Sequence, residues 1–373
     1  MLVGFGGSLK STNRFMSEGT KVAGQIKFFN HAFAESKEYT PDVCTLAEVL
    51  RSVRAFVLLT LFAVWALPAA SSSSVHVVVA PDGTGDFKTV QSAIDHALDH
   101  GPLQPKQRLI IEIRPGTYRE RVKVPQDRPR VTFLGADATT TVITFNAGAK
   151  EIGGTFFSST VEVEGAEFEA ANLTFENSHG AGTQAVAVTV YSDRAVFQKC
   201  RFVGWQDTLY AASGRQYFRD CFIEGHIDFI FGNASAVFEN CEIYSRGAGY
   251  ITAQSRLTPD SATGYVFIHC RLTGENTGRD VYLGRPWRDY SHVVFMNCYL
   301  GEHIRPEGWS DWNNTGRSKT AWYAEYGSEG PGAKQDKRIP WARQLTEAQV
   351  RQFQPDVFLR GVDGWQPSKV GVP

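Results

Sequence analysis

The chain has 373 residues, of which 42% are hydrophobic and 12% aromatic, so it can bury a substantial core in one large domain or two small ones. Its 38 lysine and arginine residues nearly balance its 39 aspartate and glutamate residues, leaving a formal net charge of -1. This balance gives no basic surface field of the kind used to bind nucleic acid or anionic membranes. Local residues must therefore define the substrate.

The first segment that departs from this average is the apolar stretch Ala55–Ala70, which follows two arginines and runs into four serines. The order of basic, apolar and small residues is that of a secretory signal, and the stretch is shorter than the roughly 20 residues of a membrane-spanning helix. We expect residues 51–74 to be a cleaved signal peptide, and the exported protein, secreted or periplasmic, to carry no membrane anchor. Residues 1–50 are an uncertain lead: a misplaced start, or a cytoplasmic lead on an anchored protein.

Residues 89–98 have the pattern of a short amphipathic helix. Thr89 is a suitable N-cap, and the helical period places four apolar residues on one face, namely Val90, Ile94, Ala97 and Leu98. Because a repeated region follows, we expect this helix to cap the open end of that region.

Five later segments share a Phe, two variable residues, a Cys, one variable residue and an aromatic or aliphatic residue: FQKCRF, FRDCFI, FENCEI, FIHCRL and FMNCYL. Their cysteines are separated by 21, 20, 29 and 28 residues and lie at Cys200, Cys221, Cys241, Cys270 and Cys298. An earlier copy, FEAANL from Phe168 to Leu173, places Ala171 at the cysteine position. Units this short bury their apolar side by stacking on the copies above and below them.

The repeats are rich in Val, Ile, Phe, Tyr and Thr and show little helical periodicity, so each turn is expected to consist of short strands. Equivalent positions on successive turns would then stack about 4.8 Å apart. The predicted fold class is all-β: a right-handed parallel β-helix, or solenoid, with a short N-terminal capping helix, in one catalytic domain over residues 75–373. A second short helix is expected from Thr346 to Phe353.

The cysteine column is compatible in spacing with disulfides, which an exported protein could form. Small apolar cysteines stacked in a solenoid interior need no oxidation, however, and no Cys/His cluster has zinc-site spacing. We therefore favour free thiols, and expect neither a metal nor an organic cofactor.

Polar residues in three segments fall into one register of the repeat. Gln184 precedes Gln206 by 22 residues, and Asp207 precedes Asp228 by 21, so each interval is about one turn. The four side chains should stack on one wall of the solenoid, with the two carboxylates as neighbours.

Two carboxylates so close cannot both ionise freely, so one should keep its proton near neutral pH while the other stays anionic. This pair would supply an acid and a nucleophile, and the glutamine amides could hold a developing oxyanion. Arg285 and Trp287, in the segment LGRPW, offer a guanidinium that ionises one carboxylate and a flat ring for a sugar face. An isolated aspartate in a turn is usually solvated or turn-forming, but the shared register favours chemistry.

The segments QAVA, QDTLY, DFIFGN and LGRPW, together with GTYRE at Gly116–Glu120, resemble the motifs of pectin methylesterases. The resemblance extends from Val78 to about Gln366. Several multi-residue motifs in the same order make this a more specific signal than any single pattern.

The resemblance implies roles that agree with the chemistry above. Asp228 matches the nucleophile of the family, and Asp207 matches its general acid and base. Gln184 and Gln206 match the oxyanion donors, and Arg285 matches the arginine that hydrogen-bonds the nucleophile. Four positions match residues that contact the galacturonate chain: Trp287, Thr155, Tyr210 and Phe231.

The activity implied is hydrolysis of the methyl esters of pectin, with methylated polygalacturonan as the partner and the enzyme acting as a monomer. Two alternatives remain open on the residues alone: a β-helix glycoside hydrolase, which also uses paired carboxylates, and a non-catalytic β-helix that binds polysaccharide through its aromatic residues. One departure from the family is His226, where relatives commonly carry a smaller residue. It either tunes the acidity of the site or fills the turn before the strand.

Overall fold

The structure, a computed structural model, describes residues 74–97, 106–275 and 278–372, and these described residues belong to one compact unit. The expected lead over residues 1–50 and all but the last residue of the expected signal peptide over residues 51–74 lie outside the described residues, so both stay predictions. Within the described part of the chain, no helix is long and apolar enough to cross a membrane.

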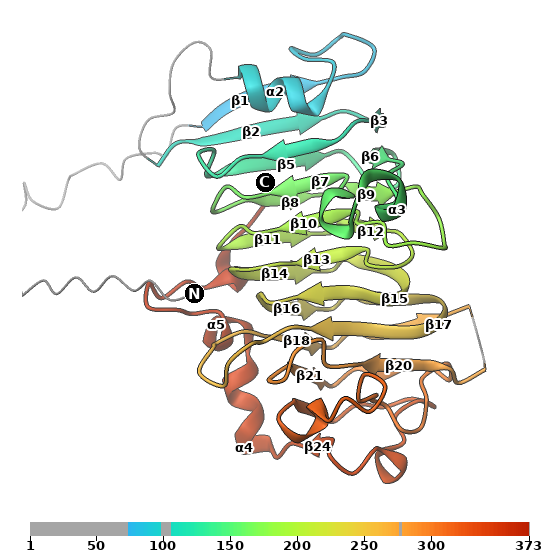
Figure 1. Cartoon of the computed structure of the whole chain (residues 1–373). Helices are drawn as coiled ribbons and strands as arrows, with labels where there is room; N and C mark the ends of the chain where they lie inside the picture. The colour runs from blue at the N-terminus through green and yellow to red at the C-terminus, as the bar shows by residue number, and fades with distance from the viewer. Residues whose placement is uncertain (1–73, 98–105, 276–277, 373) are drawn as a thin grey trace, which may run out of the picture. The chain divides into compact units, whose positions relative to one another are not determined.

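One wall of the unit is an eleven-stranded sheet in which every neighbouring pair of strands is parallel (Figure 1). Its strands follow one another in chain order while others intervene in the sequence, as expected for a chain that returns to the same wall once per turn. The strands are, in order, β1 (Ser74–Val79), β2 (Arg108–Ile113), β5 (Val131–Gly135), β8 (Glu169–Ala171), β11 (Ala195–Gln198), β14 (Arg215–Arg219), β16 (Ser235–Glu239), β18 (Gly264–Ile268), β21 (His292–Met296), β23 (Trp322–Tyr326) and β24 (Arg343–Gln344).

A thirteen-stranded sheet supplies the other two walls. One wall contains β3 (Gly116–Arg119), β6 (Thr141–Phe145), β9 (Thr174–Asn177), β12 (Arg201–Val203), β19 (Arg271–Gly274) and β22 (Tyr299–Leu300). The other contains β4 (Val122–Val124), β7 (Val161–Val163), β10 (Val188–Val190), β13 (Leu209–Ala211) and β20 (Val281–Gly284). Two long strands, β15 (Phe222–Gly232) and β17 (Glu242–Gln254), continue from one wall into the next. The predicted parallel β-helix is confirmed.

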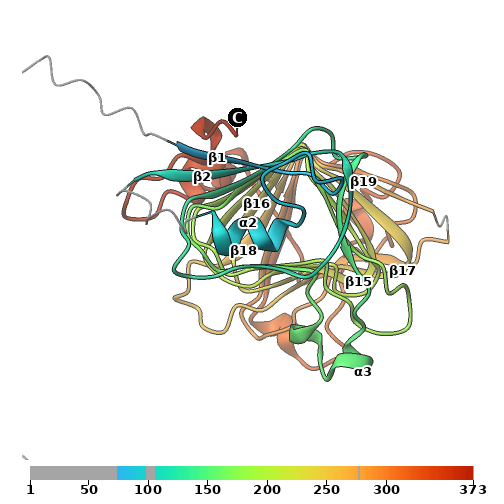
Figure 2. The same ribbon diagram turned by 90° about the horizontal axis from the view of Figure 1, so that it is seen from above.

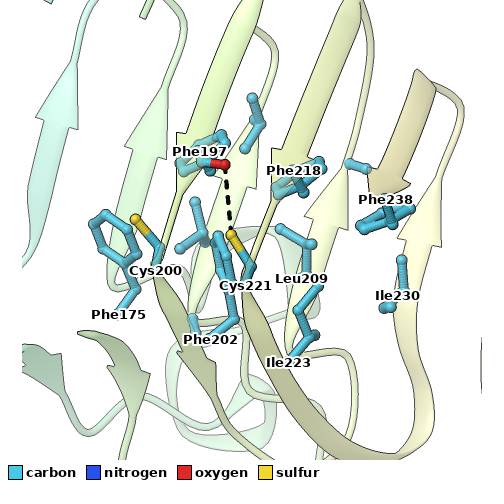
Figure 3. Packing of buried hydrophobic residues seen from close by; sticks show 14 of the residues in the cluster. Phe175, Phe197, Cys200, Phe202, Leu209, Phe218, Cys221, Ile223, Ile230 and Phe238 are labelled. Carbon is cyan, nitrogen blue, oxygen red and sulfur yellow. Dashed lines mark hydrogen bonds between the residues drawn. The ribbon is translucent and has the colours of Figure 1, made fainter. Parts of the chain in front are cut away.

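Phenylalanines form a continuous stack through the core along the eleven-stranded sheet. The rings of Phe197, Phe218, Phe238, Phe267 and Phe295 are nearly parallel, with successive centroid distances of 4.9, 4.7, 4.5 and 4.3 Å. Figure 3 shows the first three of these rings on adjacent strands. These distances are close to the spacing between parallel strands, so each turn places its ring directly on the ring of the turn before.

The cysteine position of the repeat follows a sharp corner. The residue before each cysteine has a positive φ of 52 to 57°, and these residues are Lys199, Asp220, Asn240, His269 and Asn297. A left-handed residue turns the chain out of the eleven-stranded sheet, and Asn and Asp tolerate this conformation better than most residues. The following cysteines are buried and free in the structure, and they are Cys200, Cys221, Cys241, Cys270 and Cys298.

The thiols also satisfy part of the backbone. Cys221 Sγ donates to the carbonyl of Phe197 at 3.5 Å (Figure 3), and Cys241 Sγ donates to that of Phe218 at the same distance. Cys270 repeats this contact with Phe238, one turn further along. The motif thus joins an aromatic stack, a corner and a thiol that binds the previous turn.

The predicted alignment of the earliest copy is wrong by two residues. Ala170 pairs with Phe197, and Thr174 pairs with Arg201, so Leu173 rather than Ala171 lies in the cysteine column. Phe168 lies two residues before Ala170, which occupies the ring column, and its ring packs against that of Phe197 with an interplanar angle of 50°. The left-handed corner, which fixes the register, lies at Asn172 with a φ of 58°.

Helix α2 (Val90–His96) closes the first turn of the solenoid, as predicted. Thr89 caps it by accepting a hydrogen bond from the Ser92 amide at 3.2 Å. Glu120 accepts two further amide hydrogen bonds at its N-terminus, from Val90 at 2.9 Å and from Gln91 at 3.0 Å. Viewed from above, the helix lies across the mouth of the coil (Figure 2).

The second predicted helix is also present, as α4 (Glu347–Val350) with a Thr346 capping box, followed by η4 (Arg351–Phe353) and α5 (Pro355–Phe358). This C-terminal tail covers apolar residues on the outer face of the eleven-stranded sheet, among them Tyr217, Val237 and Val266. The other helical turns of the described residues lie in connections: α3 (Ala149–Ile152), η1 (Thr155–Phe157), η2 (Arg317–Lys319), η3 (Gln335–Lys337) and η5 (Pro367–Lys369).

Candidate active site

The predicted polar column lies where the chain enters the wall formed by β10, β13 and β15. Gln184 and Gln206 form a parallel bridge, so they lie side by side on adjacent turns. Leu209 pairs with Ile230, and the same offset puts Asp207 opposite Asp228. The Asp207 amide donates to the carbonyl of Ile227 at 3.1 Å, which ties the two turns together at this level.

Both aspartates have left-handed backbones, with φ of 64° at Asp207 and 50° at Asp228. A non-glycine residue in this region is uncommon, and two on adjacent turns indicate that the conformation is held by the surrounding structure. Both side chains are also largely buried, with exposed fractions of 9% and 6%. The fold therefore keeps two carboxyl groups in a confined space at the cost of backbone strain.

Arg285 binds one of these carboxylates through two parallel hydrogen bonds. Its Nε donates to Asp228 Oδ1 at 2.9 Å, and its Nη2 donates to Asp228 Oδ2 at 2.7 Å. Such a bidentate, charge-assisted pair favours the ionised form of the carboxylate and fixes its plane. Asp228 is therefore the anion of the site.

The two carboxyl groups differ in acidity for physical reasons. Burial raises the pKa of Asp207 well above its usual range, the nearby charge of Asp228 raises it further, and Arg285 opposes both effects only in part. The pKa of Asp228 is also raised by burial, but to a smaller extent, because the hydrogen bonds and the charge of Arg285 oppose that effect. Asp207 thus keeps its proton while Asp228 is the more readily ionised member of the pair.

The two glutamines are half-buried beside the carboxylates. Gln184 Oε1 accepts a hydrogen bond from Thr183 Oγ1 at 3.3 Å, and this contact does not use the NH2 group of the same amide. Among the described residues, neither Gln184 nor Gln206 donates a side-chain hydrogen bond. Both therefore retain neutral donors on the wall that carries the carboxylates.

Aromatic side chains form a row beside the site. Tyr210 stacks on Phe231 with ring centroids 4.6 Å apart, and Phe231 lies 5.9 Å from Trp287. At the other end, Phe156 lies 5.2 Å from Tyr210 and is 49% exposed. Thr155 begins the same helical turn as Phe156, so its segment adjoins the row. Phe231 itself is only 4% exposed and supports the rings around it.

Two residues of the site were not predicted from the sequence. The guanidinium carbon of Arg285 lies 3.8 Å from the ring centroid of Tyr250 and 4.0 Å from that of Trp312. Trp312 belongs to a connection far from any recognised motif, and only its spacing after LGRPW would have drawn attention to it.

His226 lies beside the site without joining it. Its ring meets the edge of Trp205, with centroids 5.5 Å apart, and the Arg246 guanidinium covers the same indole at 4.1 Å. Burial lowers the pKa of His226, so the imidazole is neutral near pH 7. These contacts give His226 a packing role, and when protonated its charge would also lower the pKa of Asp228. Within the described residues, no group of three or more His, Cys, Asp or Glu side chains could hold a metal ion.

An ionised aspartate clamped by an arginine, a protonated aspartate on the next turn and a flanking row of aromatic rings together define a carbohydrate-acting hydrolase built on a parallel β-helix. Residues 76–362 match the pectinesterase family. The chain belongs to the pectinesterase family.

Similar proteins agree with this classification. "Pectinesterase 31" of Arabidopsis thaliana is 43% identical over 294 residues, which cover 76% of this chain and 92% of that protein. The solved pectin methylesterase from carrot is 38% identical, with a TM-score of 0.72, and covers 77% of this chain and 93% of that one. A pectin methylesterase from Aspergillus niger is 31% identical, with a TM-score of 0.66 and coverage of 74% and 91%.

The match also has a limit in some relatives. The "Probable pectinesterase/pectinesterase inhibitor 21" of Arabidopsis thaliana is 40% identical, but the matched region is 46% of its length. The predicted family and the predicted enzyme class, a carboxylic ester hydrolase, are confirmed. The glycoside hydrolase and the non-catalytic binding protein are not favoured.

Proposed function

We propose that this protein hydrolyses the methyl esters of pectin, with Asp228 as the nucleophile and Asp207 as the general acid and base. The observation that carries the assignment is the asymmetry of the pair: Arg285 clamps Asp228 through two hydrogen bonds, whereas burial raises the pKa of Asp207. An anion and a proton donor thus coexist on adjacent turns, as acyl transfer requires.

In the first step, an Asp228 oxygen attacks the carbonyl carbon of a galacturonate methyl ester, and the carbonyl oxygen becomes an oxyanion. The amides of Gln184 and Gln206 donate hydrogen bonds to this oxyanion without neutralising the nucleophile. When the C–O bond to the methoxy group breaks, Asp207 gives its proton to the leaving oxygen and methanol departs. An anhydride then joins Asp228 to the galacturonate carbonyl.

In the second step, Asp207, now a carboxylate, takes a proton from water as the water oxygen attacks the anhydride carbonyl. The bond to Asp228 breaks and its carboxylate returns to the clamp of Arg285. The polymer keeps a free galacturonate carboxyl group. Atoms balance as one water consumed and one methanol released, with no cofactor required.

We assign substrate binding to the row of aromatic rings, because sugar rings present apolar faces that stack on such surfaces. Trp287 and Tyr210 would contact the chain directly, Phe231 would support them, and Thr155 would lie at one end. A solved pectin methylesterase that is 31% identical to this chain is described as a complex with a hexasaccharide, which supports a groove able to hold several sugars.

Pectin is a polymer of the cell wall, so the place of action is extracytoplasmic. Export by cleavage of a signal peptide over residues 51–74, a monomeric mature enzyme and a catalytic domain over residues 75–373 belong to the same proposal. N-terminal sequencing of the exported protein tests the boundary, since a start near Ser71 supports it and a start within residues 1–50 contradicts it.

The activity is tested with the purified protein on highly methylated polygalacturonan, by measuring both methanol and new reducing ends. We expect methanol release without shortening of the polymer. Asp228→Asn and Asp207→Asn should each reduce turnover by about a thousandfold or more. Asparagine is the better replacement because both positions have a positive φ, at which alanine would add strain of its own. Reducing ends without methanol, or normal turnover in either variant, would refute the assignment.

A further inference from the structure

The guanidinium of Arg285 is held on its faces as well as along its edge. Tyr250 and Trp312 approach it to 3.8 and 4.0 Å, within the range of direct cation–π contact. Among the described residues, these two rings make no ring contact with each other, so they meet the guanidinium from different sides. The edge of the same group carries the two hydrogen bonds to Asp228.

The backbone of Trp312 is strained where the ring is presented. Trp312, Asn313 and Asn314 have successive φ values of 39, 60 and 61°, a run of left-handed residues that begins with a bulky aromatic. Single left-handed residues are common at corners, but such a run is costly and persists only where its surroundings enforce it. Backbone strain of this kind is concentrated at functional sites.

The neighbouring contacts enforce this conformation. Trp309 bridges to Gly284 and the Ser310 amide donates to the carbonyl of Gly284 at 3.1 Å, so the segment lies directly beside Arg285. Asp311 closes the turn by accepting hydrogen bonds from the amide and the hydroxyl of Ser318, at 2.9 and 2.8 Å.

The far end of the turn is attached to the LGRPW segment as well. Arg317 Nη1 donates to the carbonyl of Pro286 at 3.2 Å, next to Arg285 in the chain. The strained turn is therefore fixed on both sides to the segment that carries the arginine, and its one large side chain lies on the guanidinium.

We propose that Trp312 is a positioning residue that acts through Arg285. With Tyr250 on another side, it fixes the plane of the guanidinium so that both donors meet the two oxygens of Asp228 at once. This inference rests on the proposed roles of Asp228 and Arg285 in ester hydrolysis. Without the indole, the arginine can rotate, one hydrogen bond is lost for part of the time, and Asp228 ionises less readily.

The test compares Trp312→Leu, Trp312→Phe and the unaltered enzyme by methanol release from methylated polygalacturonan across a range of pH. We expect Trp312→Leu to lower kcat by roughly 5- to 30-fold at neutral pH with KM little changed. The acid limb of the kcat profile should move up by about 0.5 to 1 pH unit. Trp312→Phe, which keeps a ring face, should recover most of both losses.

Trp365→Leu is the matched control, because that indole also lies against an arginine, 5.5 Å from the Arg215 guanidinium, but belongs to the C-terminal tail. It should leave the pH profile unchanged. Should Trp312→Leu fail to fold, Tyr250→Leu removes another ring from the same guanidinium and is expected to shift the acid limb in the same direction.

The possible outcomes distinguish the role of Trp312 from the proposed ester hydrolysis. A rise in KM with normal kcat and an unmoved acid limb would make Trp312 a sugar-binding platform and overturn the inference, even though Asp228→Asn remains inactive. Absence of methanol release by the unaltered enzyme would instead overturn the proposed function itself.

Discussion

At the scale of single residues, the site depends on two carboxyl groups of different acidity. Both would have the same pKa if they were exposed to solvent. Asp207 and Asp228 have the same chemistry, similar burial and the same left-handed backbone, and it is chiefly the arginine that distinguishes them. The sequence could predict the pair from its register, and the arginine from its motif. It could not predict the ring of Trp312, because that contact depends on a strained turn 27 residues after Arg285. Nor could it predict the ring of Tyr250, which lies on the neighbouring strand β17 outside the recognised motifs.

A pH profile should report this asymmetry directly. Turnover requires an ionised Asp228 and a protonated Asp207, so kcat should fall below the pKa of Asp228 and above that of Asp207. Because the charge of Arg285 lowers the pKa of Asp228, Arg285→Gln should move the acid limb up by about 1 to 3 units and lower kcat at neutral pH by at least about tenfold. Arg285→Lys keeps the charge but not the two parallel hydrogen bonds, so its acid limb should lie between those of the unaltered enzyme and Arg285→Gln. An acid limb that stays in place in Arg285→Gln would contradict the assignment of Asp228.

The raised pKa of Asp207 also has a consequence for stability. A carboxyl group whose pKa is higher in the folded than in the unfolded protein binds its proton more tightly when folded, so its contribution is full below the unfolded value near 4 and is lost as pH rises toward the folded value. Asp207→Asn cannot ionise, so the variant does not lose this stability as pH rises. We expect its Tm to match that of the unaltered enzyme near pH 4 and to exceed it by about 2 to 5 °C at pH 7, measured by calorimetry.

Asp95→Asn, on the exposed face of α2, is the control for this measurement. Its Tm difference from the unaltered enzyme should not grow with pH. Equal Tm differences for the two variants at every pH would mean that Asp207 is not the protonated member of the pair.

At the scale of the repeat element, the recurring pattern combines a stacked ring, a left-handed corner and a buried thiol. The sequence predicted the ring and thiol columns because both positions are apolar and constant in type. It misaligned the earliest copy because FEAANL also has a Phe at its start, whereas the true register follows Asn172 at the corner. The corner residue is polar and varied, so its backbone conformation could not be recognised by residue type.

The corner can be tested at Asn240, which is exposed and has a φ of 54°. Glycine adopts this conformation freely, so Asn240→Gly should change the free energy of unfolding by less than about 1 kcal/mol. Asn240→Val should lose about 2 kcal/mol, because a β-branched side chain is strained at positive φ. Urea unfolding measures both, and Glu112→Val on the extended strand β2 is the control that should be nearly neutral. A neutral Asn240→Val would refute the role of the corner.

At the scale of the whole folded unit, the C-terminal tail joins turns that are distant in sequence. Arg215 donates to Asp193 on its own side and to Asp363 in the tail, at 2.5 Å for its Nη1. It also donates to the tail carbonyls of Leu359 and Arg360, at 3.4 and 3.2 Å. Arg194 Nη1 also donates to Asp363, at 2.9 Å. The tail thus covers the outer face of the eleven-stranded sheet and is held there by two arginines.

Hydrogen bonds and charge from Arg215 hold the pKa of Asp363 well below its usual range, so the stability that this attachment contributes is full above about pH 4 and is lost as pH falls toward the lower folded value. Since Asp363 is exposed, salt should weaken the attachment too. We expect Asp363→Asn to make the tail more susceptible to limited proteolysis at neutral pH while the coils stay resistant. Asp336→Asn, an exposed aspartate of η3, should leave the cleavage rate unchanged, and a tail equally resistant in both variants would exclude the attachment.

The buried thiols can report the order in which the turns of the solenoid unfold. Each of Cys200, Cys221, Cys241, Cys270 and Cys298 belongs to a different turn, and none is more than 2% exposed. Once Cys44, which lies outside the described residues, is replaced by serine, a thiol reagent can modify a turn only while that turn is open. If the solenoid frays from its ends, Cys200 and Cys298 will be labelled before Cys241; if it opens as one unit, all five will share a single rate.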